Sequence, residues 1–226
     1  MPTLTLTLIL GCGRQPDPDV QLPDPSAATF VAGIDHPYMP MPIGATWAYD
    51  SVDGAEHIDV EVLADTRVVN GVNATVVYDA AFLDGVLVEE TWDWYAQDND
   101  GNVWYLGEDT CEVENGACVN HHGAWEWGVD GAVPGWVMPA TPTVGQTYYQ
   151  EWYAGEAEDV GEVVEIGGSV EVPGGSFTDC VRTHDTSTLD TTLDEFKYAC
   201  DGVGYALIDE PDTRVELTAS NLPETR

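Results

Sequence analysis

The sequence predicts an all-β protein made of two tandem antiparallel units, each a curved sheet or half-barrel. Apolar and polar residues alternate along much of the chain, as they do in strands with one buried face. Clusters of Gly, Asp, Asn and Pro separate the alternating segments and are typical of turns. The same β-rich pattern occurs twice, at an offset of roughly a hundred residues, which indicates an internal repeat.

The repeat places one unit at residues 29–122 and the other at residues 143–226. The matched segments are Gly44–Trp47 with Gly145–Tyr148, Val68–Gly71 with Val170–Gly174, and Tyr95–Gly101 with Tyr198–Gly204. A chain of 226 residues can form one continuous domain or two closely associated ones.

Individual strands follow from the alternation. In the first unit Ile58–Val62 alternates strictly, Val86–Tyr95 is rich in β-formers, Asp98–Gly101 is a tight turn, and Asn102–Leu106 is the return strand. The strands predicted in the second unit are Thr147–Tyr153, Val160–Ile166, Ser169–Val172, Phe177–Thr183, Glu195–Ala199 and Tyr205–Asp209. The whole is a series of antiparallel hairpins.

The N-terminus is expected to be a targeting segment. Leu4–Leu10 is apolar and too short to span a bilayer, and Ile9–Cys12 resembles the lipobox of bacterial lipoproteins, although no Lys or Arg precedes it. Residues 1–12 would then be a lipoprotein signal peptide, with Cys12 as the lipid acceptor. Residues 13–28, rich in Pro, Asp and Gln, would be a flexible tether. The predicted location is the bacterial cell envelope, outside the cytoplasm.

The remaining cysteines predict disulfides. They are Cys111, Cys118, Cys180 and Cys200, an even number that suits an exported protein. The local pairing is favoured, because Cys111 and Cys118 flank an Asn-Gly turn and the other two are symmetric about Asp190. A four-residue loop would place Cys111 opposite Cys118, whereas a two-residue turn would place Val113 there. The rival interpretation is a metal site formed by Cys111, Cys118, His121 and His122.

Residues 123–142 join the two units and are rich in Trp, Pro and Gly. A long irregular segment of this kind is often functional or packed by its own side chains. Its large apolar residues either fill the seam between the units or line a ligand pocket. The candidate ligand-binding residues are Trp125, Trp127, Trp136, Met138, Asp93 and Tyr95.

Several motifs together resemble a family of uncharacterised bacterial secreted proteins and lipoproteins. They are Ile34–Tyr38 with Pro42–Trp47, Asp93–Asp98, Gly101–Tyr105, Pro134–Pro139 and Gly155–Asp159. His36 stands where Asn is more usual in that family. The resemblance implies export and a β-rich fold, and it implies no particular activity.

The charge is strongly acidic, with 41 Asp and Glu against 6 Lys and Arg, a net of −35. Such a surface repels nucleic acid and anionic headgroups, so nucleic acid is excluded as a partner. The excess either solubilises the surface or attracts divalent cations and basic partners.

One acidic cluster is a candidate calcium site, because hard carboxylate oxygens suit that ion. Its residues are Glu151, Glu156, Glu158 and Asp159. The alternatives are a solvated acidic turn, or a general acid and base for glycan cleavage that would use Glu151, Glu156 or Asp93. The signatures of serine hydrolases, zinc proteases and nucleotide-binding loops are missing.

The favoured interpretation is a lipid-anchored envelope protein with no catalysis of its own. Its role would be structural, or the binding of a small molecule, lipid or glycan. The alternatives are a calcium-binding envelope protein and a carboxylate-dependent polysaccharide hydrolase or lyase.

Overall fold

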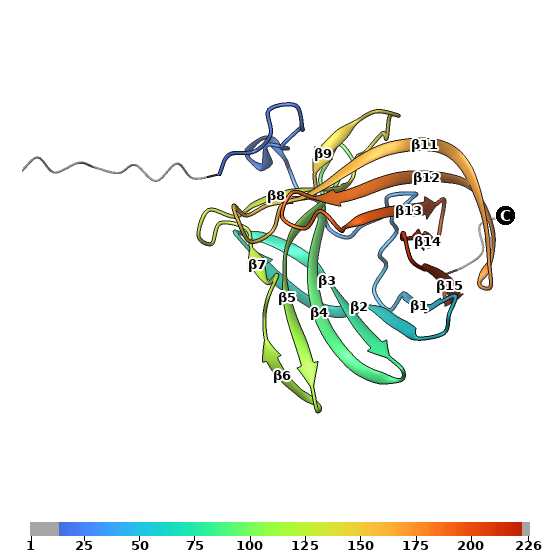
Figure 1. The fold of residues 1–226 in the computed structure, drawn as a ribbon. Coiled ribbons are helices and arrows are strands. Elements are labelled where there is room, and N and C mark those ends of the chain that lie inside the picture. Colours follow the sequence, from blue (N-terminus) through green and yellow to red (C-terminus); the bar gives the residue numbers. More distant parts are fainter. Residues whose placement is uncertain (1–13, 223–226) are drawn as a thin grey trace, which may run out of the picture.

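The computed structural model describes residues 14–222, which form an antiparallel sheet that is nearly closed into a barrel (Figure 1). The all-β prediction is confirmed: in this range the only helix is a short 3-10 turn, Pro25–Ala27. The strands are β1 (Thr46–Ser51), β2 (Glu56–Val69), β3 (Val72–Leu83), β4 (Val86–Gln97), β5 (Val103–Glu114), β6 (Ala117–Asn120), β7 (Trp125–Glu126), β8 (Val133–Met138), β9 (Thr147–Tyr149), β10 (Glu151–Trp152), β11 (Asp159–Val172), β12 (Gly175–Ser187), β13 (Asp194–Cys200), β14 (Gly204–Asp209) and β15 (Arg214–Ser220).

Most strands pair with their neighbours in the sequence, and two contacts bring distant parts of the chain together. β1 pairs with β15, which connects the first half of the chain to its end. β9 and β10 are separated by Gln150 alone; β9 pairs with β11, and β10 pairs with β8. The segment from Thr147 to Trp152 therefore connects the two end strands of the sheet and brings the wall close to closure.

Strands of both sequence halves form this one wall, so the predicted division into two units is not confirmed. The two copies do begin alike. The Gly44 amide donates to the Val62 carbonyl and the Gly145 amide to the Val163 carbonyl, both at 2.8 Å. A local correspondence is present, but inter-strand hydrogen bonds run continuously from one half into the other.

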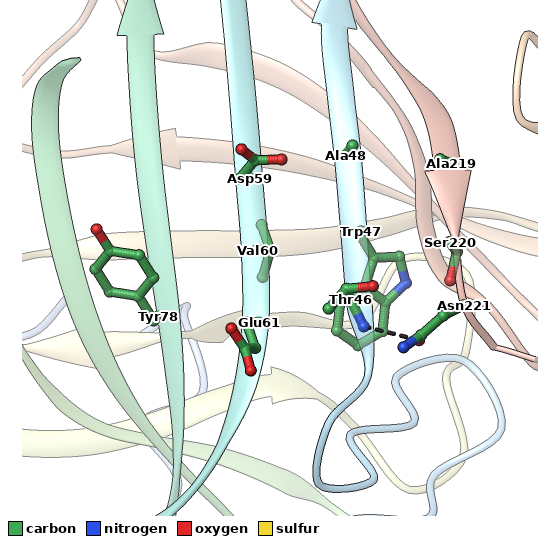
Figure 2. A pocket seen from close by; sticks show the side chains of 10 residues that line it. All are labelled: Thr46, Trp47, Ala48, Asp59, Val60, Glu61, Tyr78, Ala219, Ser220 and Asn221. Carbon is green, nitrogen blue, oxygen red and sulfur yellow. Dashed lines mark hydrogen bonds between the residues drawn. The ribbon is translucent and has the colours of Figure 1, made fainter.

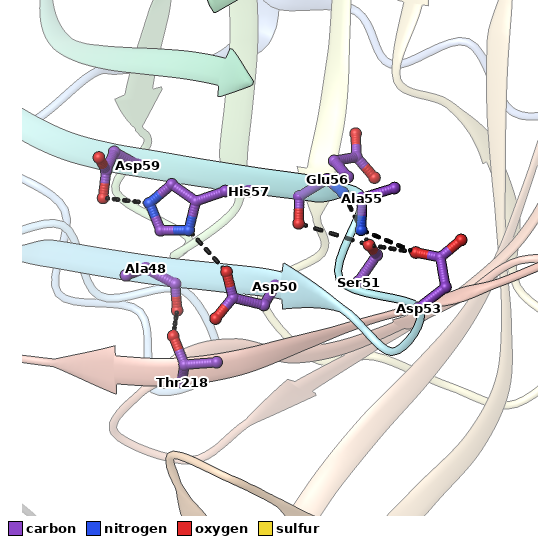
Figure 3. Close-up of polar contacts among 9 residues, drawn as sticks. All are labelled: Ala48, Asp50, Ser51, Asp53, Ala55, Glu56, His57, Asp59 and Thr218. Atoms are coloured by element: carbon purple, nitrogen blue, oxygen red, sulfur yellow. Dashed lines mark hydrogen bonds and ion pairs between the residues drawn. The ribbon is translucent and has the colours of Figure 1, made fainter. Parts of the chain in front are cut away.

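The hairpin turns contain the residues that their geometry requires. Asn70-Gly71 and Asn115-Gly116 both have positive φ at each position, as two-residue hairpin turns need. The turn between β1 and β2 is held by side chains (Figure 3). Ser51 Oγ donates to Asp53 Oδ1 at 2.7 Å and accepts from the Glu56 amide at 2.9 Å.

Two strand predictions need correction. The strand predicted at 147–153 is divided at Gln150 into β9 and β10, which pair with different strands. The sequence predicts separate strands at 160–166 and 169–172, whereas β11 runs unbroken from Asp159 to Val172. The register shifts around Gly168, and Gly167 has a φ of +78°. The two glycines form a bulge that bends the strand instead of a turn that reverses it.

Both predicted disulfides are present. Cys180 lies directly opposite Cys200 on β12 and β13, with 3.9 Å between their Cα atoms. Cys111 and Cys118 are also bonded, although Val113 is the residue opposite Cys118, because the turn has two residues. The bridge therefore runs diagonally, and the rival metal site is not formed.

Two segments expected to be irregular lie against the barrel. Residues 14–28 contact the barrel. Arg14 forms an ion pair with Glu158 at 2.8 Å, and Gln21 forms an isolated β-bridge with Tyr148. The join contributes β7 and β8, which both pair with β5. The predicted signal peptide and its Cys12 lie outside the described residues.

The main core cluster lies within the barrel, and a second covers the outer side of β3–β5. The inner cluster includes Trp47, Tyr49, Val62 and Leu217. The outer cluster includes Trp94 and Trp104, covered by Phe30 and by tryptophans of the join. Successive side chains of β3, β4 and β5 point to opposite faces of the sheet. One set therefore packs in the outer cluster, and the other set faces the interior of the barrel.

Candidate ligand-binding cavity

A cavity of about 220 Å³ lies inside the barrel. Apolar and aromatic side chains form most of its lining, and a few polar groups join them. The lining residues are Met39, Pro40, Met41, Trp47, Tyr49, Ile58, Val60, Val77, Asp79, Asp93, Tyr95, Lys197, Gly204, Tyr205 and Ile208. Concave apolar sites with a few placed polar groups are typical of small-molecule binding.

Successive side chains of a strand point to opposite faces, and some acidic side chains therefore point into this interior. Asp79 on β3 and Asp93 on β4 line the cavity, while their neighbours Tyr78 and Trp92 form a ring contact of their own. Cross-strand partners share a face of a sheet, and Asp93 is paired with Glu108 on β5. Glu108 therefore faces the interior as well.

The acidic layer continues around the other side of the barrel. Asp185 on β12 is paired with Glu195 on β13 and with Gly161 on β11, so these positions share the inner face. Asp159, two residues before Gly161, has the same orientation. Glu151 on β10 is 5% exposed, and the charges of Asp159 and Glu108 act on it. Carboxyl groups thus surround the interior on neighbouring strands.

Lys197 on β13, the only lysine of the chain, lines the cavity and neutralises part of this charge. Its Nζ lies 3.2 Å from Asp185 Oδ2 and 3.1 Å from Glu195 Oε2. Burial lowers the pKa of Lys197, but the two carboxylates outweigh this effect and hold it well above its usual value.

The other interior carboxyls have raised pKa values. Burial is the main cause, and the neighbouring acids add to it. The pKa of Asp79 rises to about 7, that of Asp93 to about 6 and that of Glu108 to about 9. Burial also raises the pKa of Asp159, and it raises that of Glu151 well above its ordinary range. The Tyr105 hydroxyl donates to Asp93 Oδ1 at 2.5 Å, which keeps that shift smaller.

Several buried polar atoms of this layer have no hydrogen-bond partner among the described residues. They are Glu151 Oε2, Asp185 Oδ1, Tyr148 Oη and Trp125 Nε1. Each residue is at least nine-tenths buried. None of these four residues lines the cavity, and the Trp125 side chain lies close enough to Glu151 to limit the rise of its pKa.

The structure divides the ligand-binding residues that the sequence suggests. Asp93 and Tyr95 line the cavity, and Trp125 packs edge-on against Tyr105 with 5.4 Å between ring centroids. The others lie elsewhere. Trp127 contacts Phe30 in the outer cluster, Trp136 contacts Trp104, and Met138 is fully buried in the core.

The four acids suggested as a calcium site do not converge. Glu156 is exposed in a turn, and Glu158 is fully buried and paired with Arg14. Glu151 and Asp159 face the interior. Between residues 14 and 222 no group of three or more His, Cys, Asp or Glu side chains is arranged to hold a metal ion.

Sequence reasoning missed Asp79, Glu108, Lys197 and Tyr205. Lys197 offered one signal, since a single lysine among 41 acidic residues is expected to be paired with several of them. No sequence signal marked Asp79 and Glu108 as inward-facing. Inward and outward positions alternate along a strand, and only the register between strands decides which positions face inward.

The outer surface offers a groove of a different kind (Figure 2). It has a volume of about 560 Å³ and lies over β1, β2 and β15, with Asp59 and Glu61 along β2. Asn221 Oδ1 accepts from the Thr46 amide at 2.9 Å across one end. Nearby, His57 lies between Asp50 and Asp59 at 2.7 and 3.2 Å (Figure 3). The hydrogen bond to Asp50 is the main cause of a raised pKa for His57. These are exposed pairs of an acidic surface.

The fold and the cavity define a nearly closed antiparallel β-barrel with an acidic interior. Comparison with protein-family models, with curated proteins and with solved structures finds no match.

Proposed function

We propose that this chain is an exported, lipid-anchored envelope protein that binds a small molecule inside its barrel and performs no catalysis. The observation that carries the proposal is the interior cavity, with a mostly apolar wall and the charged groups of Asp79, Asp93 and Lys197. A cavity of about 220 Å³ inside the barrel suits a small molecule, whereas a polysaccharide chain needs a longer site. Binding is therefore favoured over glycan cleavage.

Export and anchoring are supported by other features. Ile9–Cys12 resembles a lipobox, and disulfides such as Cys180–Cys200 are typical of oxidising compartments. Within the described range there is no helix long and apolar enough to cross a membrane. We expect labelled palmitate to be incorporated on export, and Cys12→Ala to abolish both the label and sedimentation with membranes. Unchanged labelling in Cys12→Ala would contradict the anchor.

Ligand binding is tested by native mass spectrometry of the full-length protein, exported, extracted in detergent and purified without chelator. We expect a small molecule to be retained. Val77→Phe places a larger side chain in the cavity and should abolish retention. The matched control is Val68→Phe on β2, where the side chain is 63% exposed. A bare mass for the wild type, or equal retention in both variants, would contradict the proposal.

Fluorescence gives a second readout. Trp47 lines the cavity, whereas Trp127 lies in the outer cluster. Ligand binding should therefore change the emission of the wild type and of Trp127→Phe, and change that of Trp47→Phe much less. A response that is undiminished in Trp47→Phe would place the ligand elsewhere.

A further inference from the structure

One of the two disulfides lies on the hairpin of β5 and β6, which projects from the barrel (Figure 1). Its two cysteines differ in exposure: Cys118 on β6 is exposed, whereas Cys111 on β5 is 5% exposed. The other bridge, Cys180–Cys200, is fully buried. A thiolate can attack a disulfide only at a sulfur that it reaches, so attack on the hairpin bridge is directed to Cys118.

A histidine lies beside this exposed cysteine. His121 directly follows β6, and its Nε2 lies 3.4 Å from Cys118 Sγ. Its other ring nitrogen, Nδ1, lies 3.0 Å from Asp109 Oδ1. Asp109 precedes Cys111 by two residues on β5, so both side chains are on the same face of the sheet. A sulfur, an imidazole and a carboxylate that orients the ring are the groups that activate a cysteine nucleophile.

Hydrogen bonds of the turn after β6 hold the ring in this place. The His122 amide donates to Asn120 Oδ1 at 2.9 Å. The Ala124 amide donates to the His121 carbonyl at 3.2 Å. Asn120 Nδ2 in turn donates to Glu112 Oε2 on β5. The backbone on both sides of His121 is therefore fixed to the hairpin, and the contact with Cys118 follows from the local fold.

The other titratable side chains of residues 109–122, and those on the adjacent part of β4, are mostly acidic. They are Glu89, Glu90, Asp109, Glu112, Glu114 and His122. Carboxylates oppose the formation of a thiolate nearby, and a protonated histidine favours it. The side chain of His122 is 86% exposed and lies 3.9 Å from Glu112. His121 is therefore the cation in contact with the exposed sulfur.

Opening of this bridge leaves the barrel wall in place. It joins neighbouring strands at a sequence separation of 7. The pairing of β5 with β4, β7 and β8 involves other residues or the backbone alone. Exposed disulfides are the ones that take part in exchange, whereas bridges that resist reduction are structural.

We propose that Cys111 and Cys118 form a thiol–disulfide exchange site for a pair of cysteine thiols on another exported protein. One thiolate of the partner attacks Cys118 Sγ, the bond to Cys111 breaks, and Cys111 leaves as a thiolate that takes up a proton. The second partner thiol attacks the partner's own sulfur in the mixed disulfide and releases Cys118 as a thiolate beside protonated His121. Two electrons and two protons thus pass from the partner, which becomes a disulfide, to the hairpin, which becomes a dithiol.

In the reverse direction Cys118 is the attacking sulfur and the buried Cys111 resolves the mixed disulfide. This site goes beyond the proposed function, because none of its residues lines the barrel cavity. One chain exchanges one bridge, and the reaction is stoichiometric.

The first test is reduction of the full-length, exported protein by dithiothreitol near neutral pH. Samples are quenched with iodoacetamide, and each cysteine is assigned by peptide mass spectrometry. We expect the Cys111–Cys118 bridge to open at least about 100-fold faster than the buried Cys180–Cys200 bridge. The near-ultraviolet circular dichroism should keep its tertiary signal while the hairpin bridge opens. Similar rates for the two bridges, or loss of that signal on opening, would overturn the proposal.

The second test assigns the role of His121 by the pH dependence of alkylation of Cys118 in the protein with only the hairpin bridge reduced. The midpoint of the profile should lie at least about one pH unit lower in the wild type than in His121→Ala. The matched control, His122→Ala, should follow the wild type. Above the midpoints all three should react alike, because the thiolate then forms without help. Equal midpoints in His121→Ala and the wild type would contradict the assignment.

The third test separates the two sulfurs, with cystamine as the disulfide probe. Cys111→Ala should rapidly form a mixed disulfide at Cys118 and retain it, because the resolving thiol is missing. Cys118→Ala should react much more slowly, because Cys111 is buried. Faster capture by Cys118→Ala would reverse the assigned roles and overturn the mechanism. If either cysteine variant fails to fold, the reduction rates of the wild type and the histidine variants still decide.

Discussion

At the scale of single residues, Lys197 is paired with two carboxylates at once. It is the only lysine and faces the acidic interior, where it contacts Asp185 and Glu195. A buried or partly buried charge is stable only beside a partner, and each carboxylate here depends on the same ammonium. The residue therefore holds β12 and β13 together in the acidic layer.

Replacing Lys197 with methionine should destabilise the protein by about 3–5 kcal/mol at neutral pH, because two carboxylates lose their cation. The loss should shrink in acid, where those carboxyls take up protons. Urea unfolding at several pH values measures it. The control is Arg214→Met, which removes exposed pairs to Asp209 and Glu216 and should cost no more than about 1 kcal/mol. Equal losses in the two variants would mean that the interior is well solvated.

At the scale of elements, the closure of the barrel depends on a close approach of backbones. A Cβ added at Gly135 on β8 would lie 2.0 Å from the Tyr149 carbonyl oxygen. No side chain can move to relieve that contact, since the obstacle is main chain. A glycine is therefore required where β8 meets the segment that bridges the two ends of the sheet.

Gly135→Ala should destabilise the barrel by about 3 kcal/mol, at the upper end of the overpacking range. Amide exchange in β9 and β10 should accelerate, because these strands would be displaced. Gly168→Ala is the control, since a Cβ there meets its nearest atom at 3.5 Å and the position needs no positive φ. An unchanged unfolding midpoint in Gly135→Ala would show that closure is looser than described.

The two disulfides should contribute unequally. Cys180–Cys200 is buried and spans 20 residues, and Cys111–Cys118 spans 7 at an exposed hairpin. Loop entropy predicts costs of about 3 and about 2 kcal/mol, and burial adds to the first. Paired alanine variants, compared by urea unfolding, measure both. A larger loss for the Cys111/Cys118 pair would contradict this order.

At the scale of the whole molecule, the acidic interior predicts the pH dependence of stability. Carboxyls with raised folded-state pKa values bind more protons folded than unfolded, so stability falls as pH rises. The window runs from the unfolded values, roughly 4, through the folded values of about 6, 7 and 9 for Asp93, Asp79 and Glu108.

Between its two pKa values each such group should remove up to about 1.4 kcal/mol of stability per pH unit. Urea unfolding of the ligand-free protein between about pH 5 and pH 9 measures the slope. Glu108→Gln should flatten it above neutral pH, whereas the exposed Glu171→Gln should leave it unchanged. Stability that rises over this range would mean that the interior carboxyls are ionised in the empty barrel.

Features set by interactions between residues close in the chain could be predicted from the sequence, and features set by contacts between distant residues could not. Alternation and turn residues predicted most strands, since these signals are local. The break expected at Gly167-Gly168 was wrong, because a glycine pair allows either a turn or a bulge, and pairing with β12 selects the bulge. Of the residues suggested for ligand binding, Asp93 and Tyr95 line the cavity, whereas Trp127 and Trp136 lie in the outer cluster.

The sequence by itself determined the all-β class, the hairpin series and both cysteine pairings, because period-two patterning and turn chemistry act between near neighbours. Only the tertiary structure decided that β1 meets β15 and that Thr147–Trp152 connects the two end strands of the sheet. It also decided which acids face inward. Inward and outward positions differ by one residue of register, and that register is set by contacts between strands far apart in the chain.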